Sequence, residues 1–125
     1  MEKGGFRWPP CHLVTNNMIQ FETKTLAMHT PCGPKPLADV ALSMAIVHAE
    51  LLLIHPFREG NGRIARWLAD IMALQSGYPT PLYIFEGRGS VREKEQYINA
   101  VRKGYVMEYQ PLAELFEEAM RRFLD

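Results

Sequence analysis

Residues 37–54 read LADVALSMAIVHAELLLI, and this stretch decides the fold. Wound as a helix, it carries apolar residues on nearly every face. A helix that is apolar all round must be covered on all sides, so we expect it in the middle of a helical bundle. Ser43, His48 and Glu50 interrupt the apolar run. The run from Val40 to Ile54 is therefore too short and too polar for us to expect a membrane span.

Glycine, proline and capping residues divide the rest of the chain into further segments. Before the central helix we expect an extended segment over 4–14 and a helix from an N-cap at Thr15 to about residue 29. After it we expect a helix from near Gly62 to a stop at Gly77, and then an irregular link over 78–89 with room for a short strand at Leu82–Phe85. The chain should end with a helix from Ser90 that is interrupted at Gly104 and a last helix with Pro111 in its first turn. Ser90 and Glu93 have the spacing of a capping box. Helices joined by short links, with little strand, indicate an all-α bundle.

Length and charge exclude several classes of protein. A chain of 125 residues has the size of one domain, which we expect to span residues 1–125. Its 14 basic residues balance 14 acidic ones, so no field of one sign is available to hold nucleic acid or an anionic membrane. The first residues lack the apolar core of a secretory signal. We therefore expect a cytoplasmic protein in which Cys11 and Cys32 are reduced thiols, with one bridge between them as the alternative.

The chemistry is concentrated in residues 55–66, HPFREGNGRIAR, which link two of the expected helices. Gly60, Asn61 and Gly62 come immediately before a helix, where free N–H groups and the positive end of the helix dipole favour an anion. Arg63 and Arg66 follow three residues apart on one face, and guanidinium groups bind phosphate oxygens in a fork. Positive charge at a helix N-terminus is unfavourable without an anionic partner. The pattern predicts a site for a polyphosphate.

Two further side chains of this loop suit phosphate chemistry. Glu59 is a hard oxygen ligand for a Mg²⁺ ion that bridges phosphates, and His55 is a suitable general base. We expect Phe57 to be the apolar residue that fixes the loop to the core. His48, two turns before His55, fits a packed core histidine better than a second metal ligand. The residues alone leave a purely structural loop open as the alternative.

The same twelve residues resemble a known family. They match the complete Fic motif, His-Pro-Phe-x-(Asp/Glu)-Gly-Asn-Gly-Arg-x-x-Arg, at every defined position. The apolar helix before His55, the segment LQSGYP at 74–79 and the segment EQYINAV at 95–101 are also similar to parts of the Fic (filamentation induced by cAMP) family. The resemblance covers about residues 5–123. It implies a Fic-fold helical bundle, with the active-site loop between two central helices and a short N-terminal flap.

The resemblance also implies an activity and a set of roles. Fic proteins mostly transfer AMP from ATP to a Tyr, Thr or Ser hydroxyl of a target protein. By position, His55 would be the general base and Glu59 would hold Mg²⁺ between the α- and β-phosphates. The remaining roles concern the nucleotide: Gly60, Asn61 and Gly62 would form the anion hole, Arg63 would steady the phosphates, Arg66 would hold the γ-phosphate, and Tyr97 would border the base.

Other activities within the family stay open at this point. An intact Gly60 favours nucleotidyl transfer over the kinase-like Doc branch, which replaces this glycine. Phosphocholine transfer uses the same motif, and a nucleotide other than ATP could be the donor. A nucleotide-binding module with weak or no transfer activity is the alternative from a different class.

The chain departs from the family in two ways. No Ser or Thr is followed by Glu four residues later, so the inhibitory helix of many Fic proteins is not in this sequence. We expect a separate inhibitory, antitoxin-like protein, as in a toxin–antitoxin pair, or an upstream segment. The flap would be Gly5–Leu13, which is short and rich in proline, and the helices that usually precede it are missing. Trp8, in this flap, is expected to pack or to line the nucleotide cleft.

Overall fold

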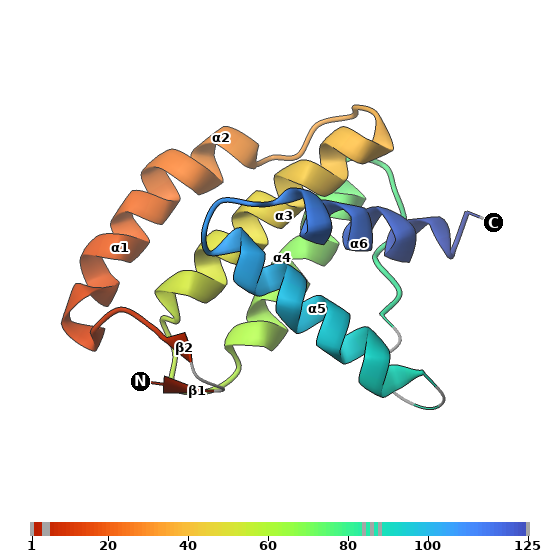
Figure 1. The fold of residues 1–125 in the computed structure, drawn as a ribbon. Coiled ribbons are helices and arrows are strands. Elements are labelled where there is room, and N and C mark those ends of the chain that lie inside the picture. The colour runs from red at the N-terminus through yellow and green to blue at the C-terminus, as the bar shows by residue number, and fades with distance from the viewer. Residues whose placement is uncertain (1, 4–5, 84, 86, 88, 125) are drawn as a thin grey trace.

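A computed structural model describes residues 2–3, 6–83, 85, 87 and 89–124. Figure 1 shows its elements in chain order. They are β1 (Glu2–Lys3), β2 (Phe6–Arg7), a 3₁₀ turn η1 (Cys11–Leu13), α1 (Val14–Gln20), a π-helical segment η2 (Phe21–Leu26), α2 (Ala27–His29), α3 (Leu37–Ile54), α4 (Asn61–Gln75), α5 (Ser90–Gly104) and α6 (Gln110–Arg121). The strands β1 and β2 pair antiparallel over two residues each. The fold is all-α, as predicted, with this short pair of strands at the N-terminus.

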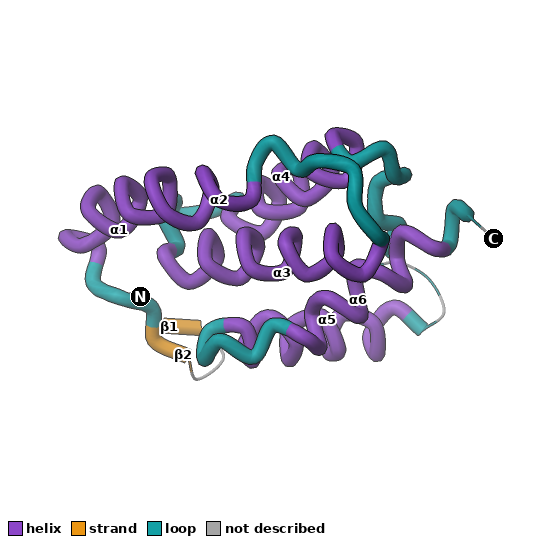
Figure 2. Tube along the Cα trace, turned by 90° about the horizontal axis from the view of Figure 1, so that it is seen from above, coloured by secondary structure: helices purple, strands orange, loops and turns teal. Residues whose placement is uncertain are grey.

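The central helix is α3. It packs against α1, η2 and α2, against α4, and against α5 and α6. Figure 2 shows α3 between a layer with α1, α2 and α4 and a layer with α5 and α6. Val40, Met44 and Val47 are fully buried on it. By length and composition alone α3 could cross a membrane, contrary to our expectation for this stretch, but 61% of it is buried inside the bundle. The all-round apolar pattern is thus that of a core helix.

The N-terminal helical path begins earlier than the sequence predicted. Thr15 is not an N-cap, because α1 starts at Val14 after the 3₁₀ turn and the N-cap residue Leu13 makes no capping hydrogen bond. The chain turns helical as soon as the extended Pro10 allows it (φ −56°, ψ 143°). Residues 14–29 then run as one path through η2 to Thr30, where the backbone becomes extended, as expected.

Glycine ends α4 in the way that the sequence predicted. Gly77 has φ +85°, and the Tyr78 N–H donates to the Ala73 carbonyl at 3.0 Å, which is the pattern of a Schellman motif. The capping box expected at the start of α5 is wrong. Gly89 is the N-cap residue and no side chain caps the helix. The Glu93 carboxylate instead pairs with Arg122 at 3.0 Å, because a charged partner at the end of α6 is within its reach.

The link between α4 and α5 is attached to α6 and not to a sheet. In its described part, Leu82 donates its N–H to the Ala119 carbonyl, and no residue is in a strand. Residue 84, in the middle of the short strand that we considered, lies outside the described residues. Pro111 lies in the first turn of α6, as predicted. Cys11 and Cys32 are both free thiols.

Candidate functional site

The loop from His55 to Gly60 connects α3 to α4 through two left-handed residues. His55 ends α3 with φ 54° and ψ 58°, and its N–H donates to the Leu51 carbonyl at 3.2 Å. Gly60 precedes α4 with φ 84° and ψ 6°. A non-glycine residue at positive φ is uncommon and concentrates at functional sites. The backbone therefore turns His55 out of the helix and toward the start of α4.

One buried side chain organises this loop. The Asn61 Oδ1 accepts the Phe57 N–H at 2.9 Å, and its Nδ2 donates to the Phe57 carbonyl at 2.6 Å. Because the Phe57 N–H fixes which end of the amide is oxygen, Nδ2 also faces the His55 Nε2, at 3.3 Å. An amide N–H only donates, so the His55 Nε2 presents its lone pair. That lone pair accepts from Asn61, which holds the imidazole ring beside the start of α4.

Phe57 itself does not fix the loop, contrary to our expectation. Its side chain is 48% exposed. The loop is held through the Phe57 backbone, on which Asn61 makes two hydrogen bonds. These bonds satisfy the polar groups of a loop that has no ladder of its own, so the aromatic ring is not needed as an anchor.

Trp8 covers one face of the candidate base. Its ring stacks on the His55 imidazole, with centroids 4.4 Å apart and planes at 24°. Beside this stack lies a cavity of about 260 Å³, lined among others by Trp8, Cys11, His55 and Phe57. The sequence suggested packing or a place in the nucleotide cleft for Trp8, and it carried no signal that pairs Trp8 with His55, 47 positions later.

The sequence predicts an anion site at the start of α4. The first N–H groups of a helix have no intrahelical partner, and those of Asn61 and Gly62 are in the first turn. Arg63 is exposed. Arg66 turns back toward the helix start: its Nη1 lies 3.0 Å from where a Cβ on Gly62 would be, and its guanidinium lies 5.7 Å from the Phe85 ring centroid. The structure thus brings a guanidinium to the end of the helix where amide dipoles converge.

Glu59 lies directly before Gly60 and is exposed. Among the described residues no group of three or more His, Cys, Asp or Glu side chains could form a metal cage. Mg²⁺ is often held by one or two carboxylates together with substrate phosphates, and it keeps several waters. A single exposed carboxylate beside an anion site fits that kind of ligation and not a closed protein cage.

Tyr97 lies deeper than a residue that simply lines a cleft. It is 8% exposed, and its hydroxyl lies 2.5 Å from the His48 Nε2. Its ring lies 5.4 Å from that of Phe85. Burial, opposed by the neighbouring Arg66, raises the pKa of the Tyr97 hydroxyl to about 12. A contact between Tyr97 and a nucleotide base stays a prediction.

His48 is the packed core histidine that we expected. It is 1% exposed, and its Nδ1 lies 3.2 Å from the Ala65 carbonyl. Burial lowers its pKa to about 3, the nearby Arg66 lowers it as well, and the hydrogen bond to Ala65 opposes them. His48 is therefore neutral at physiological pH.

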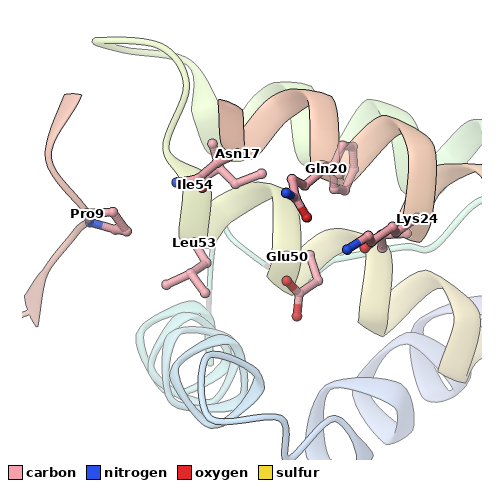
Figure 3. A pocket seen from close by; sticks show the side chains of 9 residues that line it. Pro9, Asn17, Gln20, Lys24, Glu50, Leu53 and Ile54 are labelled. Carbon is pink, nitrogen blue, oxygen red and sulfur yellow. The ribbon is translucent and has the colours of Figure 1, made fainter. Parts of the chain in front are cut away.

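A second cavity, of about 300 Å³, lies between the α1–η2 path and α3. Figure 3 shows Gln20 and Lys24 pointing toward Glu50 across it. Glu50 accepts a hydrogen bond from the Tyr109 hydroxyl at 2.5 Å. Pro9 lines this cavity and the one beside His55, so the two hollows adjoin the same segment.

The structure is thus a helical bundle whose central helix leads into a histidine loop, and Arg63 and Arg66 flank the start of the next helix. The family model described as "Fic/DOC family" matches residues 3–73, which is more than half of the chain. The chain belongs to the Fic/DOC family.

Relatives with assigned names match parts of the chain. "Protein adenylyltransferase fic-1" of Caenorhabditis elegans is 46% identical over 44 residues, which are 35% of this chain and 9% of that protein. "Protein adenylyltransferase Fic" of Nematostella vectensis is 37% identical over 60 residues, which are 48% of this chain and 13% of that protein. The chain therefore matches only a small part of the length of these curated relatives.

A solved structure matches the whole fold. The crystal structure of the BepC protein from Bartonella tribocorum, a VirB-translocated effector with bound AMPPNP, has a TM-score of 0.71 and 27% sequence identity. The match covers 95% of this chain and 54% of that one. It confirms the Fic fold that the motif implied.

Proposed function

We propose that this domain transfers AMP from ATP to a hydroxyl group of a target protein. The observation that carries the proposal is the arrangement of the loop: Asn61 holds the His55 ring beside the helix start, where the Arg66 guanidinium turns back toward Gly62. The proposed base and the proposed phosphate site thereby lie on the loop that begins at His55 and on the first turns of α4, which follow it directly. Membership of the Fic/DOC family and the nucleotide analogue bound to BepC support this assignment.

The reaction assigns a role to each side chain. The His55 imidazole takes the proton from the target hydroxyl, whose oxygen attacks the α-phosphorus of ATP. The bond from the α-phosphorus to the bridging oxygen breaks, and pyrophosphate leaves. The N–H groups at Gly60, Asn61 and Gly62, with Arg63 and Arg66, balance the charge of the phosphates. Such transfers depend on positioning and charge stabilisation more than on covalent catalysis.

Glu59 is the residue that would hold Mg²⁺. A bound Mg²⁺ would neutralise phosphate charge. The exposed carboxylate beside Gly60 is suitably placed for an ion shared with the nucleotide, because Mg²⁺ accepts phosphate oxygens and waters for most of its ligands.

The hollow beside His55 and Trp8 suits the acceptor side of the reaction. It lies next to the proposed base, and it is lined by apolar and aromatic side chains with Arg58 at one side. A target segment in this hollow would bring its hydroxyl within reach of the His55 ring. We propose a protein as the acceptor. A separate inhibitory protein, a cytoplasmic location and a single catalytic core over residues 1–125 stay predictions.

Labelled ATP tests the proposal. The domain is incubated with Mg²⁺ and a cell lysate, and with ATP labelled at the α- or the γ-phosphate in parallel reactions. AMP transfer leaves the α-label on protein and not the γ-label. His55→Ala should abolish the labelling, whereas His12→Ala, which changes an exposed histidine outside the loop, should not. Transfer of the γ-label alone would overturn AMP transfer, and equal labelling by His55→Ala would overturn the role of His55.

Intact-mass measurement of a labelled target identifies the donated group. The mass of an AMP moiety supports the proposal. The mass of another nucleotide or of phosphocholine would keep the fold and the site but replace the donor. Binding of ATP without any modified protein would support the module with weak or no transfer activity.

A further inference from the structure

Three helices meet at one buried hydrogen-bond chain that the proposed reaction does not use. His48 lies on α3, Ala65 on α4 and Tyr97 on α5. His48 and Tyr97 are 1% and 8% exposed. Buried polar groups of this kind have to be hydrogen-bonded, and a network that is fully satisfied fixes the relative placement of its elements.

The direction of each hydrogen bond follows from the groups involved. The Ala65 carbonyl can only accept, so the His48 Nδ1, 3.2 Å away, carries the proton and donates. The His48 Nε2 is then an acceptor, and the Tyr97 hydroxyl, 2.5 Å away, donates to it. The only hydrogen of that hydroxyl is thereby used, and its oxygen keeps its lone pairs for a donor.

Arg66 is that donor. It follows Ala65 on α4, and its charge and a side-chain hydrogen bond from it lower the pKa of the Tyr97 hydroxyl, against the larger effect of burial. Its guanidinium lies 5.7 Å from the Phe85 ring centroid, and the Phe85 ring lies 5.4 Å from that of Tyr97. The guanidinium therefore lies over the Phe85 ring, which in turn adjoins the ring of Tyr97. It has five N–H donors, so one bond to Tyr97 leaves others for an anion.

We propose that His48 and Tyr97 are positioning residues, which hold the Arg66 guanidinium in place for the terminal phosphate of a bound nucleoside triphosphate. This inference rests on the proposed function for the identity of the ligand. His48 orients the Tyr97 hydroxyl, and that hydroxyl presents its oxygen to Arg66. Neither side chain touches the reacting atoms.

Tyr97→Phe tests the proposal because it removes one oxygen atom and keeps the ring. ATP carries the terminal phosphate and ADP lacks it, so calorimetric Kd values for both nucleotides separate positioning of Arg66 from general damage. We expect Tyr97→Phe to weaken ATP binding about tenfold, from the loss of one hydrogen bond at a charged group, and to change ADP binding less than about twofold. Arg66→Ala should show the same preference for harming ATP.

A matched control removes a hydroxyl elsewhere. The Tyr78 hydroxyl bonds the Lys35 carbonyl at 3.0 Å, in a different part of the bundle. Tyr78→Phe should leave both nucleotide affinities unchanged. Thermal unfolding of each variant without nucleotide shows that the fold is retained, and the Arg66 Nε resonance in NMR spectra, which should move in Tyr97→Phe, reports on the guanidinium without any nucleotide.

A double-mutant cycle decides between positioning and an independent effect. If Tyr97 acts through Arg66, then Arg66→Ala/Tyr97→Phe binds ATP no more weakly than Arg66→Ala. Additive losses, an equal loss of ATP and ADP affinity in Tyr97→Phe, or an unmoved Arg66 resonance would each overturn the positioning role. If the wild-type domain transfers no AMP but the variants change ATP and ADP affinity as expected, the proposed function is contradicted and the positioning role is supported.

Discussion

Gly104, the last residue of α5, allows this helix to lie directly against α3. A Cβ at this position would be 2.6 Å from the Cβ of Ala49 and 3.7 Å from the ring of Tyr109. Carbon atoms in contact lie about 3.5–4.0 Å apart, so Gly104→Ala would force the two helices apart by roughly 1 Å. Neither Ala49 nor an alanine at position 104 has a side-chain rotamer that could relieve this contact.

The expected loss of stability follows from that overlap. Overpacking a close contact costs about 1–3 kcal/mol. Alanine is a better helix former than glycine, but at the helix end this offsets only part of the cost. We expect Gly104→Ala to lower the free energy of unfolding by about 1–2 kcal/mol, which for a domain of this size lowers Tm by roughly 4–8 °C.

Unfolding by heat and by urea, followed by circular dichroism, measures this effect. Ala49→Gly removes the opposing methyl group, so Gly104→Ala/Ala49→Gly should be more stable than the sum of the single changes by about 1 kcal/mol. Gly33→Ala is the matched control, because a Cβ there would have nothing within 4 Å. A Gly104→Ala variant as stable as the wild type, or a double variant without recovery, would refute the reasoning.

Three further predictions concern the site and its support. First, the pKa of His48 is about 3 in the folded chain, against 6.5 for an unperturbed histidine, so between these values the unfolded chain binds more protons and stability falls as the pH falls. Urea unfolding of wild type and of His48→Gln at pH 7 and pH 5 should show an extra loss of about 2 kcal/mol in the wild type, and equal losses would contradict it. Second, Gly62→Ala places a Cβ 3.0 Å from the Arg66 Nη1, so calorimetry should show weaker ATP binding at unchanged stability; unchanged ATP affinity would contradict the placement of Arg66. Third, Asn61→Ala leaves the backbone of Phe57 without its two partners and should lower stability by about 1–2 kcal/mol in urea unfolding, and a wild-type midpoint would show that the loop is held otherwise.

The features of the fold that the sequence predicted are those set by local chemistry. The all-round apolar pattern of residues 37–54 predicted a central helix, since such a surface has no other stable place. Gly77 predicted the end of α4, because its positive φ is open to glycine at little cost. Pro111 predicted the first turn of α6, where no hydrogen bond within the helix uses the N–H group that proline lacks.

The features that the sequence did not predict depend on partners far along the chain. Glu93 has the spacing to cap α5, but Arg122 from the end of α6 lies within 3.0 Å and takes its carboxylate. The same holds for Trp8, whose stacking on His55 no local pattern indicates. Local sequence favours some partners of a side chain over others, and contacts with residues far along the chain then decide which partner it has.

The residues of the motif loop show how far a motif alone can reach. It predicted an anion site at the start of α4, and the structure places the Arg66 guanidinium there. It did not separate the side chains that contact a ligand from those that hold the loop. Asn61 was expected in the anion hole through its N–H group, and its side chain bonds the Phe57 backbone and faces His55. Its N–H group remains the part of Asn61 that suits an anion.

His48 on α3 and His55 directly after it differ in chemistry because their surroundings differ. His48 is enclosed by three helices, both its ring nitrogens are bonded, and burial keeps it neutral, so it can orient Tyr97 but cannot exchange a proton with a substrate. His55, two turns later, leaves the helix through a left-handed residue and presents a ring nitrogen beside a hollow. The helix and its C-cap thus supply one histidine to the packed frame and one that we propose as the base. Because both residues are histidine, the difference in their proposed roles comes from the surroundings of each ring.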